Sequence, residues 1–180
     1  MKLYNNGLLI GRFQPLHNGH VYMIRKALKI CKTVTVFVGS SQEKGTFKNP
    51  FSYDYRKELI TKTFKKYVIS KRLNILPLED KGYGNTPKWG DYVFDYFYSC
   101  LNSYPDLYVT GFEIDRSNWL LNKNIDQLCL SRNIINISAT ECRDVIKNDN
   151  FKKFCQIMPK QLYKEYNRFK EIMNEISNCN

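Results

Sequence analysis

Residues 7–20, GLLIGRFQPLHNGH, run from a compact apolar segment through a turn into the start of a helical pattern. Residues 7–11 are expected to form a strand, and residues 18–31 repeat apolar side chains at helical spacing. The next apolar run, residues 33–38 (TVTVFV), is β-branched and nearly continuous, which is typical of a strand buried on both faces of a parallel sheet. The order strand, helix, strand therefore predicts an α/β fold.

The rest of the chain continues this alternation. Helices are expected over residues 51–67 (with Ser52 as N-cap), 89–104, 140–147 and 160–176, and strands over residues 73–78, 107–110 and 134–137, with a loop over 81–88. We predict a single doubly wound, Rossmann-like parallel sheet of about five strands with flanking helices and a C-terminal helical segment. Residues 1–180 are expected to form one domain, with an α/β core over 1–147 and C-terminal helices over 148–180.

Composition narrows the class of protein. The 180 residues carry 28 Lys and Arg against 17 Asp and Glu, a formal net charge of +11, and 43% of them are apolar. This apolar content argues against wholesale disorder, and no apolar run approaches the roughly 20 residues of a membrane-spanning helix. The polar start of the chain argues against a signal peptide. The charge indicates an anionic partner: nucleic acid, an anionic membrane surface or a phosphorylated small molecule.

The six cysteines are widely spaced and form no C-x-x-C pair, which argues against a zinc framework. Scattered thiols without a secretory signal are typical of reduced cysteines in an intracellular protein. We therefore expect a cytoplasmic location.

Residues 11–20 follow the first expected strand and open the first helix, where backbone N–H groups and the positive helix end face an anion. Gly19 permits close approach of the backbone to a ligand, and Arg12 can reach the same anion. His17 and His20 are the only histidines of the chain and share one helix face. Two other interpretations are ordinary helix-start histidines and a pair of metal ligands, although no thiol or further histidine supports a metal site.

Two more polar segments follow expected strands. Residues 39–43 (GSSQE) and 48–51 (KNPF), with Arg56 shortly after, place a polar loop and the cation Lys48 at the same sheet edge. Residues 138–143 (SATECR) follow the last expected strand, where Ser138 or Thr140 can cap a helix and Arg143 comes one turn later. A plain capping box of Ser138 with Glu141 is compatible with anion binding there.

GRFQPLHNGH resembles the H-x-G-H motif of the nucleotidyltransferase superfamily, and its GRFQP opening resembles the archaeal-type nicotinamide-nucleotide adenylyltransferases. Residues 39–56 are similar to the same family in G-S-x-Q, N-P-F and the following Arg. Residues 138–143 resemble its S-x-T-x-x-R motif, which engages the β- and γ-phosphates, with Ala139 where the family often has glycine. Class I aminoacyl-tRNA synthetases share H-x-G-H, but their K-M-S-K-S loop is not found here. The resemblance covers most of residues 7–146.

The resemblance implies attack by the phosphate of a mononucleotide on the α-phosphorus of ATP, giving NAD and pyrophosphate. The catalytic residues it implies are His17, His20, Arg12 and Arg143. The implied ATP-binding residues are Gly11, Arg12, Phe13, His17, Gly19, His20, Gly111, Ser138, Thr140 and Arg143. The implied mononucleotide-binding residues are Gln14, Ser40, Gln42, Lys48, Asn85 and Trp89. Mg²⁺ is expected to be held by the substrate phosphates, with no protein ligand.

Asn85 can hydrogen-bond a carboxamide, and Trp89 can stack on a cationic pyridinium ring or simply pack in the core. We expect ATP and nicotinamide mononucleotide, or nicotinate mononucleotide, as partners, with no membrane and no nucleic acid. A homo-oligomer is left open. The competing functions are a cytidylyltransferase, a phosphopantetheine adenylyltransferase, a basic nucleic-acid-binding protein and a silent nucleotide sensor. Most of the cations, including those of residues 160–176, are expected to be solvated surface.

Overall fold

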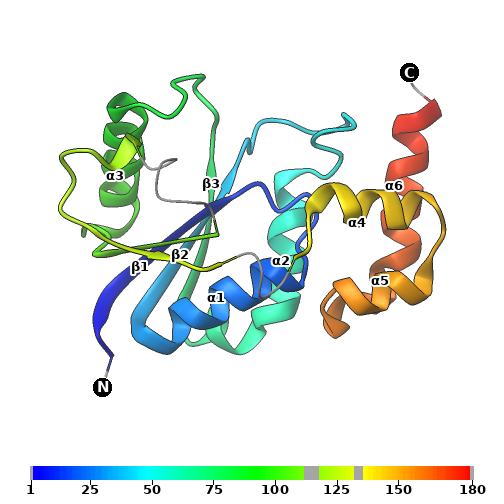
Figure 1. The fold of residues 1–180 in the computed structure, drawn as a ribbon, viewed down its shortest axis with the longest axis horizontal. Coiled ribbons are helices and arrows are strands. Elements are labelled where there is room, and N and C mark those ends of the chain that lie inside the picture. The colour runs from blue at the N-terminus through cyan, green and yellow to red at the C-terminus, as the bar shows by residue number, and fades with distance from the viewer. Residues whose placement is uncertain (1, 112–117, 132–135, 179–180) are drawn as a thin grey trace.

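Five parallel strands form one sheet in the order β3-β2-β1-β4-β5 in the computed structural model, which describes residues 2–111, 118–131 and 136–178 (Figure 1). The strands are β1 Tyr4–Gly11, β2 Cys31–Gly39, β3 Leu73–Leu78, β4 Leu107–Thr110 and β5 Asp126–Cys129. β1 is central, because Gly7 is paired with Val34 of β2 and with Leu107 of β4. The predicted α/β fold with a parallel sheet of about five strands is confirmed.

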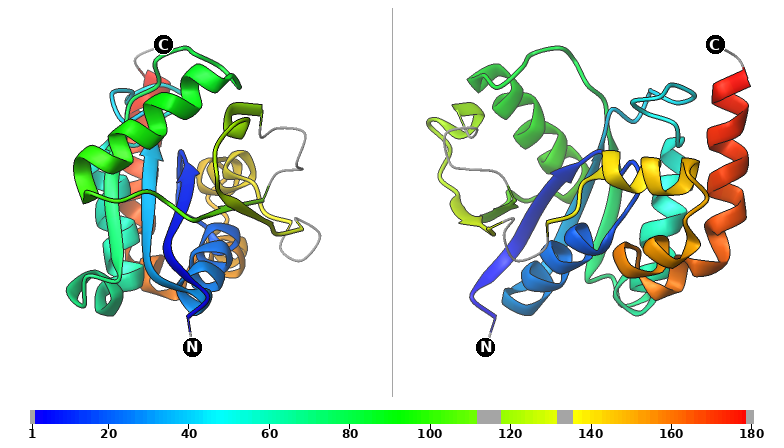
Figure 2. Two further views of the ribbon diagram at one scale, coloured as in Figure 1. Left: turned by 90° about the vertical axis from the view of Figure 1, so that its left-hand side faces the viewer. Right: turned by 45° about the vertical axis from the view of Figure 1, so that its right-hand side comes forward.

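Helices cover both faces of this sheet (Figures 1 and 2). They are α1 Asn18–Ile30, α2 Tyr53–Ile69, α3 Pro87–Leu101, α4 Ala139–Lys147, α5 Phe151–Ile157 and α6 Tyr166–Asn178, with 3-10 turns η2 Asn118–Leu120 and η4 Lys160–Glu165. α3 and η2 pack on one face, and α1 and α2 on the other, with α4 to α6 beyond them. Among the described residues, no helix combines the length and the hydrophobicity needed to cross a membrane.

The strands alternate their side chains between two cores. Leu8 and Phe37 point to the α3 face, whereas Leu9 and Val36 point to the α1 and α2 face, and all four are buried. Gly90 lets α3 approach η2 closely, since a Cβ atom there would lie 1.9 Å from the carbonyl oxygen of Trp119. Both faces of the sheet are therefore covered, as the continuous apolar run of β2 predicts.

The fifth strand is not where the sequence pattern places it. Of the expected strand 134–137, residues 134 and 135 lie outside the described residues, and Asn136 and Ile137 are not in a strand. The fifth strand is Asp126–Cys129, an edge strand whose side chains are mostly exposed. This strand is formed by backbone pairing with β4 at the edge of the sheet, so its sequence does not need the apolar pattern of a buried strand. α5 is a further element that the sequence analysis did not predict.

The strand order reverses between β1 and β4. The chain runs from β1 through β2 to β3 on one side, then crosses to β4 on the other side of β1. In open α/β sheets the loops diverge at such a point and leave a crevice beyond the carboxyl ends of the strands. The first helix begins at this point, directly after β1, so the topology predicts a ligand site between the ends of β1 and β4.

Candidate active site

A cavity of about 560 Å³ lies at the carboxyl ends of β1 and β4. Its walls come from β1, the β1–α1 turn, the start of α1, the end of β4 and the start of α4. All the residues expected to bind ATP line it: Gly11, Arg12, Phe13, His17, Gly19, His20, Gly111, Ser138, Thr140 and Arg143. Segments about 120 residues apart in the chain, such as residues 17–20 and 138–143, therefore share one cavity.

The two histidines lie against each other at the first turn of α1. His17 is the N-cap, with extended backbone at φ −136°, and its backbone N–H donates to Nδ1 of His20 at 3.4 Å. The two rings stack with centroids 3.7 Å apart, and the Phe13 ring contacts His20 at 4.7 Å. His17 is buried and His20 is half-buried in the cavity wall. The pair thus faces the cavity as a packed unit on the positive end of the helix.

Arg143 joins the α4 segment to the β1–α1 turn. Its guanidinium donates to the carbonyl oxygen of Gln14 at 2.8 Å and to Oγ1 of Thr140 at 3.1 Å. Burial lowers the pKa of Arg143 from its ordinary value, and the nearby positive charge of Arg12 lowers that pKa further. The predicted cap of α4 is present, since Oγ of Ser138 accepts from the backbone N–H of Glu141 at 3.0 Å. Two guanidinium groups and a helix N-terminus therefore converge on the same space.

Gln14 lines the cavity, but its side-chain amide is engaged with the protein itself. Its Nε2 donates to the carbonyl oxygen of Phe51 at 2.9 Å, and its Oε1 accepts from the backbone N–H of Phe51 at 2.9 Å. Gln14 is also buried. The structure thus gives this residue, expected in the mononucleotide site, a role in fixing the β1–α1 turn to the start of the α2 segment.

Arg56 of α2 is the largest fully buried side chain and lies beneath the same turns. Its guanidinium donates to the carbonyl oxygens of Arg12 and Gly39 at 2.8 Å and of Ser40 at 3.1 Å. Burial lowers the pKa of Arg56 to about 10, and the charge of Arg12 contributes. Phe13 and Ser40, at φ 51° and 46°, lie in the left-handed region that side chains rarely adopt, so Arg56 supports two strained turns.

Arg56 was not expected among the site residues, although its position in the sequence indicates that it is buried. Arg56 falls three and four residues before Leu59 and Ile60, which form the buried face of α2. A cation on the apolar face of a helix needs partners in the core, because burying an unpaired charge is costly. Its helical position therefore pointed to a buried network rather than to solvent.

The other residues expected to bind the mononucleotide lie outside this cavity: Ser40, Gln42, Lys48, Asn85 and Trp89. Gln42 exchanges two hydrogen bonds with the backbone of Asp80, which links the loops that follow β2 and β3. Oδ1 of Asn85 accepts from the backbone N–H of Trp119 at 3.2 Å. Lys48 is exposed, and the Trp89 ring packs 5.4 Å from Tyr92. The mononucleotide-binding role of this set stays a prediction.

No group of three or more His, Cys, Asp or Glu side chains is placed to hold a metal ion within residues 2–111, 118–131 and 136–178. The cavity instead presents arginine, histidine, hydroxyl and backbone N–H groups, which are donors for phosphate oxygens. A metal ion at this site would need most of its ligands from a bound phosphate chain and water, as is typical of Mg²⁺.

Comparison with known proteins finds a family model and several relatives that this chain resembles. The cytidylyltransferase-like family model matches residues 8–84. A nicotinamide-nucleotide adenylyltransferase of Thermococcus onnurineus is 34% identical over 87 residues, 48% of this chain and 46% of that protein. One of Methanococcus aeolicus is 29% identical over 153 residues, 81% of this chain and 80% of that protein. In matches such as the first, the chain spans about half the length of the curated relative.

A solved structure from Francisella tularensis, a bifunctional NMN adenylyltransferase/ADP ribose pyrophosphatase complexed with AMP and a manganese ion, matches with a TM-score of 0.74. It is 25% identical, and the match covers 97% of this chain and 52% of that one. These matches confirm the predicted resemblance to archaeal-type adenylyltransferases of the nucleotidyltransferase superfamily. The match to the Francisella structure also extends the similarity of fold through the C-terminal helices.

Proposed function

We propose, on the premise that this chain belongs to the nucleotidyltransferase superfamily, that it joins the AMP part of ATP to nicotinamide mononucleotide, or to nicotinate mononucleotide. The observation that carries the proposal is the hydrogen bond from Arg143 to the carbonyl oxygen of Gln14, with both H-x-G-H histidines in the same cavity. The names of the archaeal relatives favour the pyridine mononucleotides as acceptors. The products are the dinucleotide NAD, or its nicotinate form, and pyrophosphate.

The reaction needs positioning rather than a protein nucleophile. A phosphate oxygen of the mononucleotide forms a bond to the α-phosphorus, the bond from that phosphorus to the bridging oxygen breaks, and pyrophosphate leaves with the electron pair. The attacking oxygen is already anionic, so the protein has to align several anions that repel one another. Alignment of reactants can contribute about 7–11 kcal/mol to lowering a barrier.

We assign electrostatic roles to the residues that line the cavity. His17 and His20 donate to the phosphate oxygens around the reacting phosphorus, and Arg12 and Arg143 neutralise the triphosphate. Ser138, Thr140 and the free N–H groups of the first turn of α4 hold the terminal phosphates. Gly11, Phe13, Gly19 and Gly111 shape the space for the nucleoside. A preorganised donor of this kind is worth about 10²–10³ in rate.

The metal ion in this proposal is Mg²⁺, which supplies charge neutralisation on the phosphates when bound. The phosphates and water hold it, and the protein contributes its cations around them. The Francisella neighbour contains manganese, which supports a divalent ion of this size and charge.

The acceptor part of the site is proposed on the loops that follow β2 and β3. Ser40, Gln42, Lys48, Asn85 and Trp89 would bind the mononucleotide there, together with Gln14. The Gln42–Asp80 hydrogen bonds support this assignment, because they hold those two loops together at the carboxyl edge. Asn85 would bind the carboxamide and Trp89 the pyridinium ring.

Two further expectations stay proposals. The first is that residues 1–180 form one nucleotidyltransferase domain, in which helices of residues 148–180 pack on the α/β core. Supporting contacts are the ring contact of Phe51 with Phe169 at 5.2 Å and the hydrogen bond from Tyr55 to Glu165 at 3.2 Å. The second is the cytoplasmic location expected from the cysteines and the N-terminal sequence.

The test is pyrophosphate release across a panel of acceptors. The purified chain is mixed with ATP and nicotinamide mononucleotide, nicotinate mononucleotide or phosphopantetheine, and separately with CTP and a polyol phosphate. We expect release with one or both pyridine mononucleotides. Release only with phosphopantetheine or only with CTP would overturn the acceptor assignment, and no release in any arm would overturn the transferase function.

A further inference from the structure

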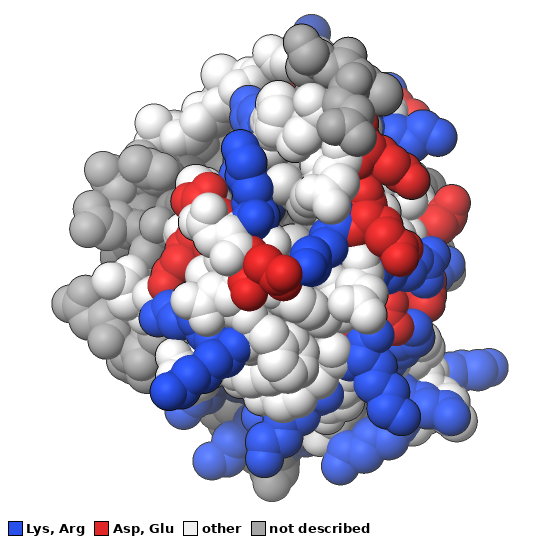
Figure 3. All heavy atoms as spheres, turned by 90° about the vertical axis from the view of Figure 1, so that its right-hand side faces the viewer, with Lys and Arg blue, Asp and Glu red and all other residues white. Residues whose placement is uncertain are grey.

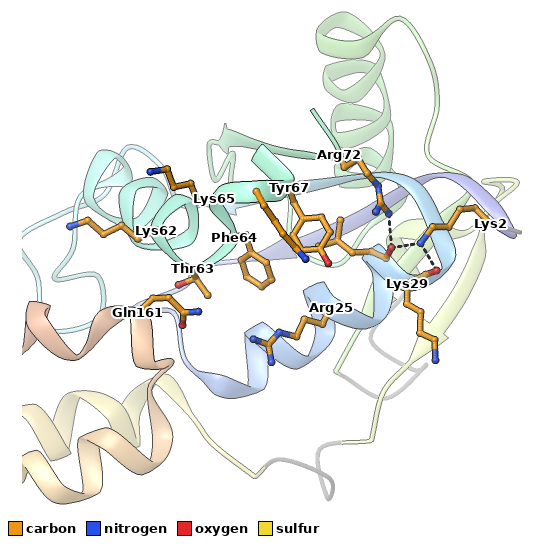
Figure 4. Close-up of a pocket in the computed structure, with 12 residues that line it drawn as sticks. Lys2, Arg25, Lys29, Lys62, Thr63, Phe64, Lys65, Tyr67, Arg72 and Gln161 are labelled. Atoms are coloured by element: carbon orange, nitrogen blue, oxygen red, sulfur yellow. Dashed lines mark hydrogen bonds between the residues drawn. The ribbon is translucent and has the colours of Figure 1, made fainter. Parts of the chain in front are cut away.

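A second cavity, of about 670 Å³, lies between α1 and α2 at the opposite end of the sheet (Figure 4). Its walls include the last turns of α1 and α2, Lys2 just before β1, Arg72 just before β3, and Gln161 of η4. It therefore lies where the strands begin, whereas the candidate active site lies where they end. The two cavities share no lining residue.

The lining of this cavity is strongly basic. Seven of its residues are Lys or Arg, and none is Asp or Glu: Lys2, Arg25, Lys29, Lys62, Lys65, Lys66 and Arg72. Lys62 is the only one of the seven with an ion pair in the described part of the chain, to Glu58 at 2.6 Å and to Glu165 at 2.5 Å. Lys and Arg side chains also gather along the lower part of the face shown in Figure 3, with Asp and Glu mainly above them.

Lys2 and Arg72 convert the end of α1 from a negative wall to a positive one. Nζ of Lys2 donates to the carbonyl oxygens of Leu28 and Lys29 at 2.6 Å. The guanidinium of Arg72 donates to Leu28 at 2.6 Å and to other carbonyl oxygens of the α1–β2 junction. A helix C-terminus with free carbonyl groups would repel an anion. Here those groups are hydrogen-bonded, and the positive charges face the cavity.

Capping does not account for the remaining cations. Arg25 and Lys29 of α1 and Lys65 and Lys66 of α2 also line the cavity, and these four side chains are exposed. Like charges that line one cavity repel each other, and an anion between them replaces that repulsion with attraction. Lys66 lies over the ring of Tyr67, 4.8 Å from its centroid, which positions its charge beside the apolar floor formed by Phe64 and Tyr67.

The cavity also offers neutral hydrogen-bonding groups at one end. Figure 4 shows Thr63, Gln161 and Arg25 grouped around Phe64 at that end, with Lys2 and Arg72 beside the last turn of α1 at the other. Charged groups at both ends suit an elongated ligand with negative charge along its length. A volume of about 670 Å³ falls within the range of small-molecule pockets, roughly 300–1,000 Å³, whereas nucleic acid is usually bound along an extended groove.

We propose that this cavity is a second anion site that takes a small molecule bearing two or more linked phosphate groups. Arg25, Lys29, Lys65 and Lys66 provide the charge, and Thr63 and Gln161 provide neutral hydrogen-bonding groups. The site is independent of the proposed adenylyl transfer, because none of its residues lines the candidate active site.

The test is a titration of the ¹⁵N-labelled chain with inorganic tripolyphosphate, followed by two-dimensional NMR at about 20 mM salt, where charge screening is weak. Amide signals of Thr63, Tyr67 and Gln161 report this cavity, and those of Gly19 and Thr140 report the candidate active site. We expect saturable shifts at the first set, and saturation at a lower concentration of tripolyphosphate than of orthophosphate. Shifts at the second set alone would overturn the proposal.

A double variant tests the charge. Arg25→Glu with Lys66→Glu is expected to weaken the affinity for tripolyphosphate at Thr63, Tyr67 and Gln161 by about tenfold or more. The matched control, Lys26→Glu with Lys57→Glu, makes the same charge change on exposed positions of the same helices outside the cavity. Equal weakening in both double variants would overturn the proposal in favour of diffuse attraction. Tighter saturation of these signals by a ten-nucleotide RNA than by tripolyphosphate would overturn the small-ligand assignment.

Discussion

The guanidinium of Arg56 lies fully buried and donates a hydrogen bond of 2.8 Å to the carbonyl oxygen of Arg12. Arg12 lies in the turn between β1 and α1, whereas Arg56 lies in α2, the next helix along the chain, yet this short hydrogen bond joins them. Arg56 also binds the carbonyl oxygens at the end of β2, so one side chain fixes the turns that follow two neighbouring strands.

Arg56→Met is expected to lower the free energy of unfolding by about 3–5 kcal/mol, because each buried carbonyl left unpaired costs about 1–3 kcal/mol. The urea midpoint, followed by circular dichroism, measures the loss. Arg56→Lys keeps a positive charge but reaches fewer carbonyl groups, so an intermediate loss is expected. A loss below about 1 kcal/mol in Arg56→Met would contradict the role assigned to this residue.

His20→Ala is expected to reduce turnover by about 10²–10³ while the fold is retained, because it removes a donor at the reacting phosphorus. Pyrophosphate release at saturating ATP and nicotinamide mononucleotide measures turnover, and circular dichroism checks the fold. Lys26→Ala, on an exposed position of the same helix, is the control and should keep full turnover. Near-normal turnover in His20→Ala would remove this residue from the catalytic set.

Arg143→Lys is expected to raise KM for ATP about tenfold or more and to lower kcat as well. Lysine keeps the charge but cannot donate to both Gln14 and Thr140, so the β1–α1 turn and α4 lose their link. Initial rates over a range of ATP concentrations separate the two effects. An unchanged KM would show that the guanidinium does not contact the triphosphate.

Gly90→Ala is expected to lower the free energy of unfolding by about 1–3 kcal/mol, since the added methyl group would overlap the Trp119 carbonyl oxygen and force α3 away from η2. Thermal unfolding of the variant measures the loss. Gly39→Ala is the control, because a Cβ atom there would meet its nearest neighbour at 3.7 Å, an ordinary contact. Equal losses in both variants would mean that the α3–η2 contact is not closely packed.

Alkaline pH is expected to destabilise the fold through buried thiols. Burial raises the pKa of Cys31 to about 11 and that of Cys142 to about 12, from an ordinary value of 9.0. Above pH 9 the unfolded chain loses these two protons and the folded chain keeps them, so the free energy of unfolding falls as pH rises. Urea unfolding between about pH 8.5 and 10 measures the slope.

The double variant Cys31→Ala with Cys142→Ala is the control for this slope. It removes the two thiols and should lessen the pH dependence most clearly between about pH 8.5 and 9, below the ordinary tyrosine pKa of 10.0, around which tyrosines of raised pKa begin to contribute. A slope unchanged by the double variant would contradict the assignment to these cysteines.

Local patterns predicted most of the fold. The strands over 73–78 and 107–110 lie where the sequence placed them, because each is a short apolar run with a clear start and end. The position predicted for the fifth strand was wrong. Its pairing with β4 is made by backbone groups and its side chains are mostly exposed, so its sequence shows no apolar pattern. The helix Phe151–Ile157 was not predicted, since its seven residues are too few to show a clear apolar period.

The ATP side of the candidate site follows from sequence spacing, because its residues lie in two short segments at strand ends, 11–20 and 138–143. The supporting contacts do not follow from spacing. Gln14 binds the backbone of Phe51, and Arg56 binds that of Arg12, and both pairs are created by tertiary folding. The loops of Asn85 and Trp89 carry no pattern that fixes their distance from the cavity.

The strand order also sets when this cavity can exist. Its walls begin at Leu9 and are completed at Arg143, and β1 meets its partner β4 only through the pairing of residues 100 positions apart, Gly7 with Leu107. A ribosome synthesises the chain from its N-terminal end, so β1, β2 and β3 are made long before α4. The two histidines are therefore synthesised more than 120 residues before Arg143, the arginine that completes their site. Nucleotide binding in this cavity would report that synthesis has passed residue 143.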